Sequence, residues 1–429
     1  MLAIFDAALA VPVWLLSLLA LLIVGLGLVI WSLKHRRDPH FRITTDAPLP
    51  DLLPSVAGLT HGQLIEGNSV EVVENGRYFD CLLSDIRAAR RSVHFETFLW
   101  KDGQAGRKLT DSLAERARAG VCVRVLVDAR GGKEMGPETR HRLQQAGCTF
   151  AAFHPSGLRA IGRINTRDHR KLAVIDGNVA WVGGHCIVDT WLGDAEDKEH
   201  FRDISVRLRG PIVHAIQSTF SENWVMTTGE LFLGDDVFPA LEDEGDVPIH
   251  VARITPLGSA SAVKILHHLA ICCARKRIWI QNPYFLPDPE GIELFANAVK
   301  RGVDVRVMTP STEASDMPIV QHAAHHNFSK LLAHGVRVFE YQRTLLHQKV
   351  MTVDGCWSAV GSSNFDDRSF EINDEITLGF HDTALAEKLE MIFESDAEHC
   401  VELTKESWSR RSLAHRVLDG ALYLVNEQL

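Results

Sequence analysis

Two short stretches of the chain combine histidine and lysine at a spacing suited to chemistry on an anion. His169-Arg170-Lys171 and His347-Gln348-Lys349 each begin the pattern H-x-K-x4-D-G, which ends at Asp176-Gly177 and Asp354-Gly355. Side chains two residues apart in a strand point the same way, so the histidine and lysine of each copy are expected to share one cleft. Asp-Gly is a strong turn signal, and a second apolar run follows each copy. The sequence therefore predicts two β-hairpins that contribute to one site.

These residue types suit displacement at a phosphodiester. An imidazole can act as nucleophile or as proton carrier near neutral pH, and ammonium groups can stabilise the charge on the equatorial oxygens. No metal or other cofactor is required by this chemistry. The candidate catalytic residues are those of the two motifs, His169, Lys171, Asp176, His347, Lys349 and Asp354. The two aspartates lie at the turns, where they are expected to brace the loops through backbone amides.

The elements that position these motifs also occur twice. Strands are predicted at residues 92–98 and 121–128, with counterparts at 277–281 and 301–308. Strands that alternate with helices indicate an α/β fold, and the repeat predicts two similar domains in a pseudo-twofold duplicate. The expected domains are residues 59–233 and 248–429, joined by an acidic linker at 234–247.

The N-terminal stretch predicts a membrane anchor. Residues 7–33 contain no charged residue, and a helix of this length exceeds the roughly 30 Å hydrocarbon core of a bilayer. We therefore expect a single transmembrane helix within residues 1–40. The basic residues at 34–37 place the rest of the chain in the cytoplasm by the positive-inside rule. Residues 41–58 are expected to be a tether.

Composition narrows the classes of partner. The net charge is −10, and no basic stripe with interleaved aromatic residues occurs, so nucleic acid is not expected as a partner. The eight cysteines form no C-x2-C pair, which favours reduced thiols. His322, His325 and His326 have helical spacing, but the sequence shows no matching carboxylate cluster, so a solvated helix face is favoured over a metal site.

The motifs and the text around them resemble the phospholipase D superfamily, and bacterial cardiolipin synthases in particular. Beyond the two motifs, the resemblance rests on residues 361–369 (GSSNFDDRS), 373–375 (NDE), 339–341 (FEY), 202–203 (RD) and 210–211 (GP), and it runs from about residue 60 to about 400. It implies two α-β-α sandwich domains and a phosphatidyltransferase of a bacterial inner membrane. It also implies a covalent phosphohistidine, usually on the first-copy histidine.

The resemblance assigns roles to individual residues. His169 would be the nucleophile and His347 the general acid and then base, although the two could be exchanged. Lys171 and Lys349 would hold the nonbridging oxygens together with Asn364. Asp203 and Glu375 would orient the imidazoles, each within its own half.

One departure from the family concerns the first half of the chain. Cys186 stands where the family often has asparagine, so a thiol replaces an amide donor. Either this position is not essential, or the neighbouring His185 takes part of its role.

The expected reaction makes cardiolipin from phosphatidylglycerol at the membrane. Hydrolysis by the same intermediate is the main alternative, and a nuclease or a non-catalytic scaffold is disfavoured because both motifs are intact and the chain is acidic. Head groups, oligomeric state and the need for a partner protein stay open. The basic, aromatic and aliphatic tail from Trp408 to Leu424 could lie in the headgroup region of anionic lipid or pack on the second domain.

Overall fold

The computed structural model describes residues 12–34, 41, 43, 45, 47–153, 166–254 and 261–423, with the backbone alone at residues 13 and 27–34. The chain divides into two compact units, Met1–His40 and Phe41–Leu429. The first unit contains helix α1 (Val13–Lys34), whose described side chains are exposed. Among the described residues, no helix combines the length and the apolar character that crossing a membrane requires. The predicted transmembrane helix is therefore not supported.

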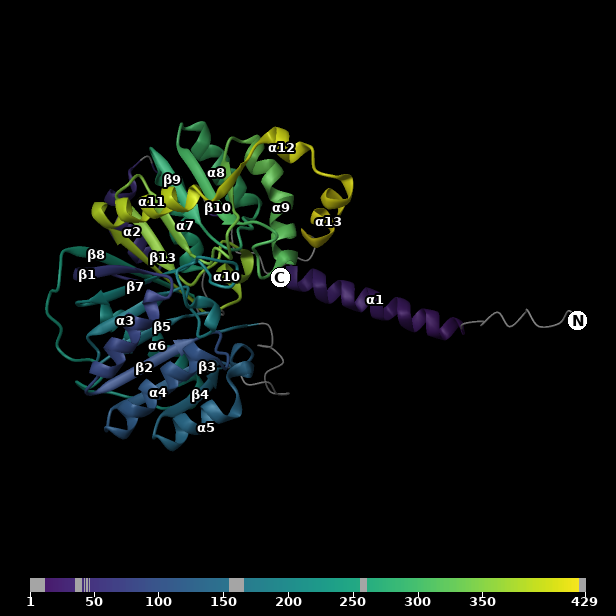
Figure 1. Cartoon of the computed structure of the whole chain (residues 1–429). Coiled ribbons are helices and arrows are strands. Elements are labelled where there is room, and N and C mark those ends of the chain that lie inside the picture. The colour runs from purple at the N-terminus through teal and green to yellow at the C-terminus, as the bar shows by residue number, and fades with distance from the viewer. Residues whose placement is uncertain are drawn as a thin grey trace, which may run out of the picture. The chain divides into compact units, whose positions relative to one another are not determined.

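The second unit is built on one sheet, which has fifteen strands within the described residues (Figure 1). The first half of the chain contributes β1 (Leu64–Glu74), β2 (Ser92–Thr97), β3 (Cys122–Asp128), β4 (Thr149–Phe153), β5 (Leu172–Ile175), β6 (Val179–Gly183) and β7 (Ile204–Arg209). The second half contributes β8 (Val247–Ile254), β9 (Arg277–Gln281), β10 (Asp304–Pro310), β11 (Arg337–Tyr341), β12 (Val350–Val353), β13 (Trp357–Gly361), β14 (Glu375–His381) and β15 (Cys400–Leu403).

The strand order confirms the duplication. β1 and β8 pair antiparallel at the centre of the sheet. Outward from β1 the order is β7-β6-β5-β2-β3-β4, and outward from β8 it is β14-β13-β12-β9-β10-β11, with β15 added at the second edge. The halves are thus alike in topology but share one continuous sheet.

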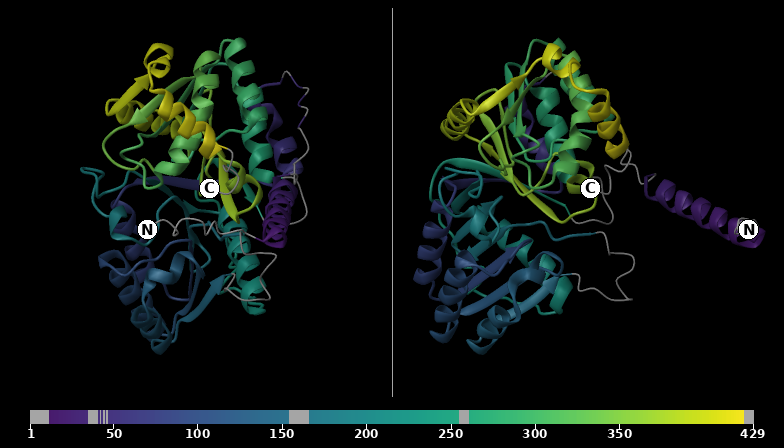
Figure 2. Two further views of the ribbon diagram at one scale, coloured as in Figure 1. Left: turned by 90° about the vertical axis from the view of Figure 1, so that its right-hand side faces the viewer. Right: turned by 45° about the vertical axis from the view of Figure 1, so that its right-hand side comes forward.

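Helices cover both faces of this sheet (Figure 2). The helices are α2 (Leu49–Leu59), α3 (Arg77–Ala88), α4 (Gln104–Arg118), α5 (Pro137–Gln145), α6 (Ile212–Thr228), α7 (Ala262–Cys273), α8 (Pro289–Lys300), α9 (Pro318–Ala333), α10 (Asp367–Glu371), α11 (Thr383–Ala397), α12 (Lys405–Ser409) and α13 (Leu413–Tyr423), with 3-10 turns η1 (Gly131–Met135) and η3 (Asp189–Trp191).

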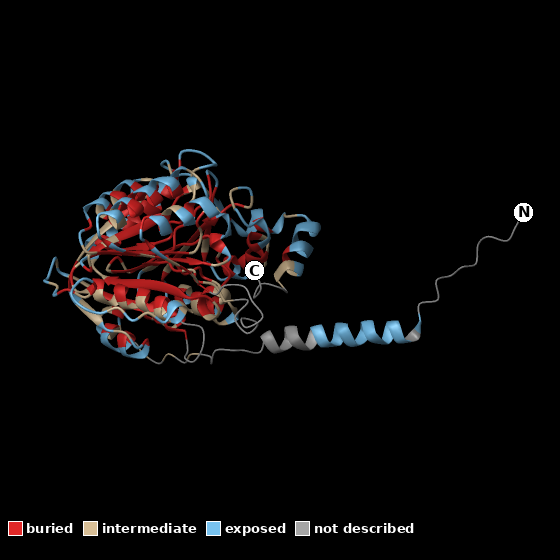
Figure 3. Ribbon diagram, turned by 90° about the horizontal axis from the view of Figure 1, so that it is seen from below, coloured by how far each residue is buried: buried red, intermediate tan, exposed pale blue. Residues whose placement is uncertain are grey.

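Alternation along β2 shows how the layers arise. Val93 and Phe95 join the core beneath α3 and α4. The side chain between them, His94, points the other way and stacks on Phe220 of α6 at 4.9 Å between ring centroids. Because alternate residues face opposite sides, a strand that is buried on both faces supports an α-β-α sandwich. The buried elements lie in the middle of the layers and the exposed residues on the outer helices (Figure 3).

The predicted tether is wrong in part. Residues 49–59 form α2, and its Leu49, Leu53 and Val56 are buried in the core that α7 and α8 share. The apolar spacing i, i+4, i+7 explains why this helix packs on the body. The predicted linker contains no helix or strand before β8 begins at Val247. The domain limits at 233 and 248 stay a prediction.

Candidate active site

The two motifs lie immediately before equivalent strands. His169 and Lys171 precede β5, and His347 and Lys349 precede β12. Between the first pair, Arg170 points away and is fully buried, with its Nη1 donating to the carbonyl of Thr219 at 2.9 Å. As the predicted alternation requires, the histidine and lysine of each motif point to the same side, and the residue between them points to the other.

Backbone hydrogen bonds join each motif to the opposite half of the chain. The amide of His169 donates to the carbonyl of Asp374 at 3.0 Å, and the amide of His347 donates to the carbonyl of Arg202 at 2.7 Å. Asp374 and Arg202 directly precede the two predicted orienting carboxylates, Glu375 and Asp203. This exchange places each carboxylate beside the histidine of the other half.

The carboxylates consequently serve opposite halves. His169 Nδ1 lies 2.8 Å from Glu375 Oε1, and His347 Nδ1 lies 2.7 Å from Asp203 Oδ2. The expectation that each carboxylate serves its own half is wrong. The physical reason is the backbone pairing just described, which brings the segments ahead of β7 and β14 across the boundary between the halves. Holding Nδ1 leaves Nε2 of each ring for chemistry.

Hydrogen bonds from neighbouring residues hold the carboxylates of Asp203 and Glu375 in place. Asp203 accepts hydrogen bonds from Trp191 Nε1 at 2.7 Å and from the amide of Ile204 at 2.8 Å. Glu375 accepts one from Ser362 Oγ. Because these contacts restrain the carboxylates, the imidazole orientations are set before any substrate arrives.

The lysines show that the two motifs form one site. Lys171 Nζ donates to the carbonyl of His169 at 2.6 Å, and Lys349 Nζ donates to the carbonyl of His347 at 2.7 Å and lies 2.9 Å from His347 Nε2. Burial lowers the pKa of each histidine well below its usual value, and both lysines lower it further. Each ammonium group thus acts on the imidazole of the other half as well as on its own.

Charge within the site is strongly perturbed. Burial lowers the pKa of Lys349 to about 7, and Lys171 adds to this effect by repulsion. Burial raises the pKa of Glu375 to about 8 and also raises that of Asp203. Buried groups of this kind, gathered around two imidazoles, are typical of a functional site. An anionic phosphodiester would relieve the repulsion between the ammonium groups.

The motif aspartates lie at the opposite ends of their strands, away from the histidines. Asp176 and Gly177 have φ values of +53° and +68°, and Asp354 and Gly355 have +55° and +67°, as a type I′ hairpin turn requires. Asp176 accepts from the amides at positions 90–92, and Asp354 from those at 275–277. Asp176 and Asp354 therefore do not join the histidines and lysines at the site, as the candidate catalytic set had predicted. They brace the turns, as expected.

Both halves of the chain match one family of proteins. The family model described as "Cardiolipin synthase, PLD-like domain" matches twice, at residues 82–224 and 269–397. The chain belongs to this phospholipase D-like cardiolipin synthase family. It is 33% identical over 367 residues to a cardiolipin synthase of Staphylococcus aureus (strain Mu50 / ATCC 700699), covering 85% of this chain and 74% of the relative.

Two further proteins are similar. The major cardiolipin synthase of Bacillus subtilis (strain 168) is 33% identical over 380 residues, covering 88% of this chain and 78% of the relative. The crystal structure of phosphatidylserine synthase from Haemophilus influenzae superposes with a TM-score of 0.70 at 14% identity, covering 87% of this chain and 98% of that one. The latter likeness concerns the fold.

The departure from the family at Cys186 can now be placed. Cys186 is buried and interacts electrostatically with Lys171 and Lys349, so it lies at the site. His185 cannot take over a phosphate contact, because its Nδ1 lies 2.8 Å from Ser205 Oγ and its Nε2 lies 3.0 Å from the carbonyl of Asn75. The second of the two sequence alternatives is therefore excluded.

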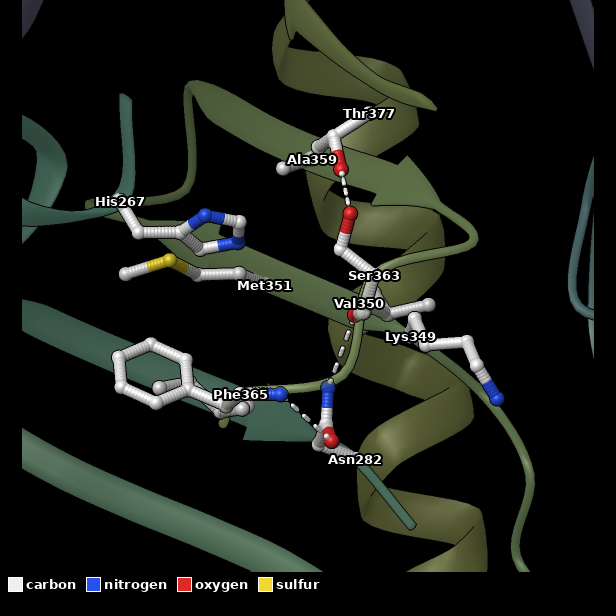
Figure 4. A pocket seen from close by; sticks show the side chains of 10 residues that line it. His267, Asn282, Lys349, Val350, Met351, Ala359, Ser363, Phe365 and Thr377 are labelled. Carbon is white, nitrogen blue, oxygen red and sulfur yellow. Dashed lines mark hydrogen bonds between the residues drawn. The ribbon is translucent and has the colours of Figure 1, made fainter. Parts of the chain in front are cut away.

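The counterpart in the second half is Asn364. Its Oδ1 is buried and lacks a hydrogen-bond partner among the described residues. Asn282 supports the loop that carries it, donating to the carbonyl of Ser363 at 3.4 Å and accepting from the amide of Phe365 at 3.1 Å (Figure 4). In this pocket the Lys349 side chain leads away from His267 and Met351 (Figure 4).

Several residues near the site carry no signal that spacing could reveal. Asn282 directly follows β9 and Trp191 ends η3, and neither residue belongs to the repeated pattern that defines the two motifs. Arg368 belongs to the segment 361–369 of the family resemblance, but the sequence predicts no role for it: it lowers the pKa of His169, and its own pKa is lowered by burial and by the neighbouring Arg167 and Arg130. A guanidinium group that acts on the nucleophile candidate suits an anionic substrate.

Proposed function

We propose that this chain is a phosphatidyltransferase that makes cardiolipin from two molecules of phosphatidylglycerol through a covalent phosphohistidine. The observation that carries the proposal is the single site in which two histidine-lysine pairs and two crossed carboxylates converge. Relatives named cardiolipin synthase, each covering most of the chain, support the choice of reaction.

His169 is the proposed nucleophile. Its lowered pKa keeps the imidazole neutral at pH 7, and Glu375 at Nδ1 leaves the lone pair of Nε2 free to attack. Nε2 forms a bond to phosphorus while the bond from phosphorus to the glycerol oxygen breaks. Because burial also lowers the pKa of His347, Lys349 Nζ supplies the proton to His347 Nε2 as that ring passes one to the departing alkoxide, giving free glycerol and a phosphatidyl-enzyme.

His347 then reverses its role. The free hydroxyl of a second phosphatidylglycerol gives its proton to His347 Nε2 and attacks phosphorus, and the bond from phosphorus to His169 breaks. The product is cardiolipin, and both histidines return to their starting states. Lys349 Nζ, 2.9 Å from His347 Nε2, is placed to exchange a proton with this ring.

Positive charge stabilises the two transition states. Lys171 and Lys349 are proposed to bind the nonbridging oxygens, and Asn364 to add an amide donor. Arg368 increases the positive potential beside His169. Because the proposed substrates are membrane lipids, we expect the protein to work at the surface of a bacterial membrane.

The test is to incubate the purified full-length protein with labelled phosphatidylglycerol alone and to resolve the products. Cardiolipin and free glycerol in equal amounts, reduced at least about 10⁴-fold in His169→Ala and His347→Ala, are expected. Phosphatidic acid as the main product would show that the chain is a hydrolase and not a transferase. Unchanged turnover in either variant would contradict the assignment of the site.

A further inference from the structure

The C-terminal helix α13 is docked by its polar side. His415, Asp419 and Tyr423 are spaced by four residues and therefore share one helical face. Asp419 is 2% exposed, and its Oδ1 lies 2.9 Å from Nδ1 of His322 on α9. The ring of Tyr423 stacks on that of His326 at 4.4 Å.

A second contact fixes the same face. Arg411 Nη1 donates to Asp419 Oδ2 at 2.6 Å, and the Arg411 guanidinium carbon lies 3.4 Å from the ring centroid of Trp408. The sequence could not show that a carboxylate lies beside His322, because α13 and α9 are far apart in the chain and pack side by side only in the fold (Figures 1 and 2). One oxygen of Asp419 thus joins α13 to α9, and the other joins α13 to Arg411, which stacks on Trp408 of α12.

The opposite side of α13 is apolar and faces outward. We name it the outer face of α13, and it consists of Leu413, Ala414, Val417, Leu418 and Ala421. Leu413 is 73% exposed and Val417 is 62% exposed. Helices on globular proteins ordinarily bury their apolar side and expose their polar side. In α13 only Leu422 packs against the core, and the other apolar side chains face outward, so the outer face of α13 has the character of a surface that binds an apolar partner.

Charge around the outer face identifies the partner. Arg410, Arg411 and Arg416 lie in or next to α13, and Asp419 is the one acidic residue between positions 407 and 423. Since Asp419 is buried against Arg411, this segment presents positive charge on a chain whose net charge is −10. Exposed apolar residues bordered by arginines match the interfacial region of an anionic bilayer.

We propose that the outer face of α13 inserts into the interfacial region of a bilayer that contains anionic phospholipid, and so holds the enzyme on the surface from which it takes its substrate. The choice of a lipid partner rests in part on the proposed function. It goes beyond that function because it assigns the membrane contact to a particular helix.

The experiment uses the full-length protein with p-benzoylphenylalanine in place of Val417. A matched control carries the same probe in place of Met391, which is 63% exposed on α11. Both proteins are irradiated on vesicles of phosphatidylglycerol and phosphatidylethanolamine, and adducts are identified by mass spectrometry. We expect lipid adducts at position 417 in at least about tenfold excess over position 391. Because both proteins keep the same N-terminal segment, that segment cannot cause the difference.

Three results would overturn the proposal. These are equal lipid adducts at both positions, no lipid adduct at position 417, or protein adducts in place of lipid at position 417. Cross-linking needs no turnover, so it separates this proposal from the proposed function. A lipid adduct at position 417 without cardiolipin formation would contradict the proposed reaction and still support the proposed membrane contact of α13.

Activity gives a second measurement. Val417→Asp should lower turnover on vesicles about fivefold or more and leave turnover in detergent micelles within about twofold, because micelles deliver substrate without a docking step. Met391→Asp should change neither. Equal losses of Val417→Asp activity in both assays would indicate a folding defect and contradict the proposed role of this face.

Discussion

At the scale of single residues, the two imidazoles are held alike but are not equivalent. Glu375 lies 2.8 Å from His169 and Asp203 lies 2.7 Å from His347, each from the other half of the chain. Lys349 Nζ lies 2.9 Å from His347 Nε2, whereas Lys171 Nζ donates to the carbonyl of His169. An ammonium group against Nε2 suits a proton carrier, which supports assigning proton transfer to His347 and attack to His169.

The crossed pairs predict which residues are energetically coupled. Replacing Glu375 by glutamine should lower kcat about 10²- to 10⁴-fold, because a neutral amide cannot stabilise the positive charge that develops on the imidazole when it attacks phosphorus. In a double-mutant cycle, the effect of Glu375→Gln should largely vanish in a His169→Ala background and persist in a His347→Ala background. Residual turnover of each variant provides the measurement. The reverse pattern would show that each carboxylate serves its own half.

The lowered pKa of Lys349 predicts how kcat/KM falls at alkaline pH. Its folded pKa of about 7 lies below the usual 10.5, so its charge is present below pH 7 and is lost as pH rises through 7. Since a charged ammonium is needed to bind the phosphodiester, kcat/KM should fall above about pH 7 in the free enzyme.

The matched control for this limb is Lys349→Arg, which stays charged at all accessible pH values. Its residual kcat/KM should lose the alkaline limb near pH 7. An unchanged limb in Lys349→Arg would assign that titration to another group.

At the scale of elements, two equivalent hairpins set the positions of the motifs. The turn of the second hairpin needs a residue with positive φ at Asp354, and the carboxylate there accepts from three consecutive amides that open β9. The hairpin β12-β13 is thereby pinned to its neighbouring strand. His347 and Lys349, proposed as catalytic and located at the other end of β12, depend on this register.

Asp354 predicts a difference between two substitutions. Asp354→Ala should lower the free energy of unfolding by about 2–3 kcal/mol. The change leaves the backbone amides at 275–277 without their acceptor and forces alanine into the left-handed region. Asp354→Asn keeps an acceptor and tolerates positive φ, so a loss of about 1 kcal/mol or less is expected. Urea unfolding followed by fluorescence measures both. Wild-type stability in Asp354→Ala, with activity abolished, would instead indicate a direct catalytic role.

At the scale of the whole molecule, the halves form one enzyme because neither holds a complete site. The central pairing of β1 with β8 makes the sheet continuous. Arg202 adds a polar link, with Nε donating to Asp396 Oδ1 at 2.9 Å and Nη2 to Glu74 Oε2 at 2.7 Å. The carbonyl of Arg202 accepts from the amide of His347, so this contact between the halves also positions the ring that is proposed as the proton carrier.

Arg202→Ala should therefore lower the free energy of unfolding by about 3–5 kcal/mol, because it leaves the buried Asp396 without its cationic partner. Arg337→Ala is the control: it removes a half-exposed pair with Glu402 and should cost less than about 1 kcal/mol. Chemical denaturation measures both. Equal losses of unfolding free energy in the two variants would mean that the Arg202 contacts between the halves stabilise the fold no more than a surface ion pair does.

Much of this arrangement could be predicted from local spacing. The H-x-K-x4-D-G repeats give the hairpins, the turn role of the aspartates and the duplicated α/β topology, because strand alternation and turn chemistry are encoded within a few residues. The crossed carboxylates could not be predicted, since Glu375 lies 206 positions from His169 and the choice between halves depends on tertiary pairing. The docking of α13 through Asp419 and His322 depends on long-range packing in the same way.

The measurement that tests the central claim most directly is to trap the covalent intermediate. The His347→Ala variant should lack both the acid of the first step and the base of the second. It is mixed with a phosphatidyl p-nitrophenyl ester, whose leaving group needs no general acid, then quenched in alkali and digested for mass spectrometry. We predict a phosphatidyl group on the peptide containing His169 and none in His169→Ala. A phosphatidyl group on His347 in the His169→Ala variant, with none on His169 in either protein, would contradict the account.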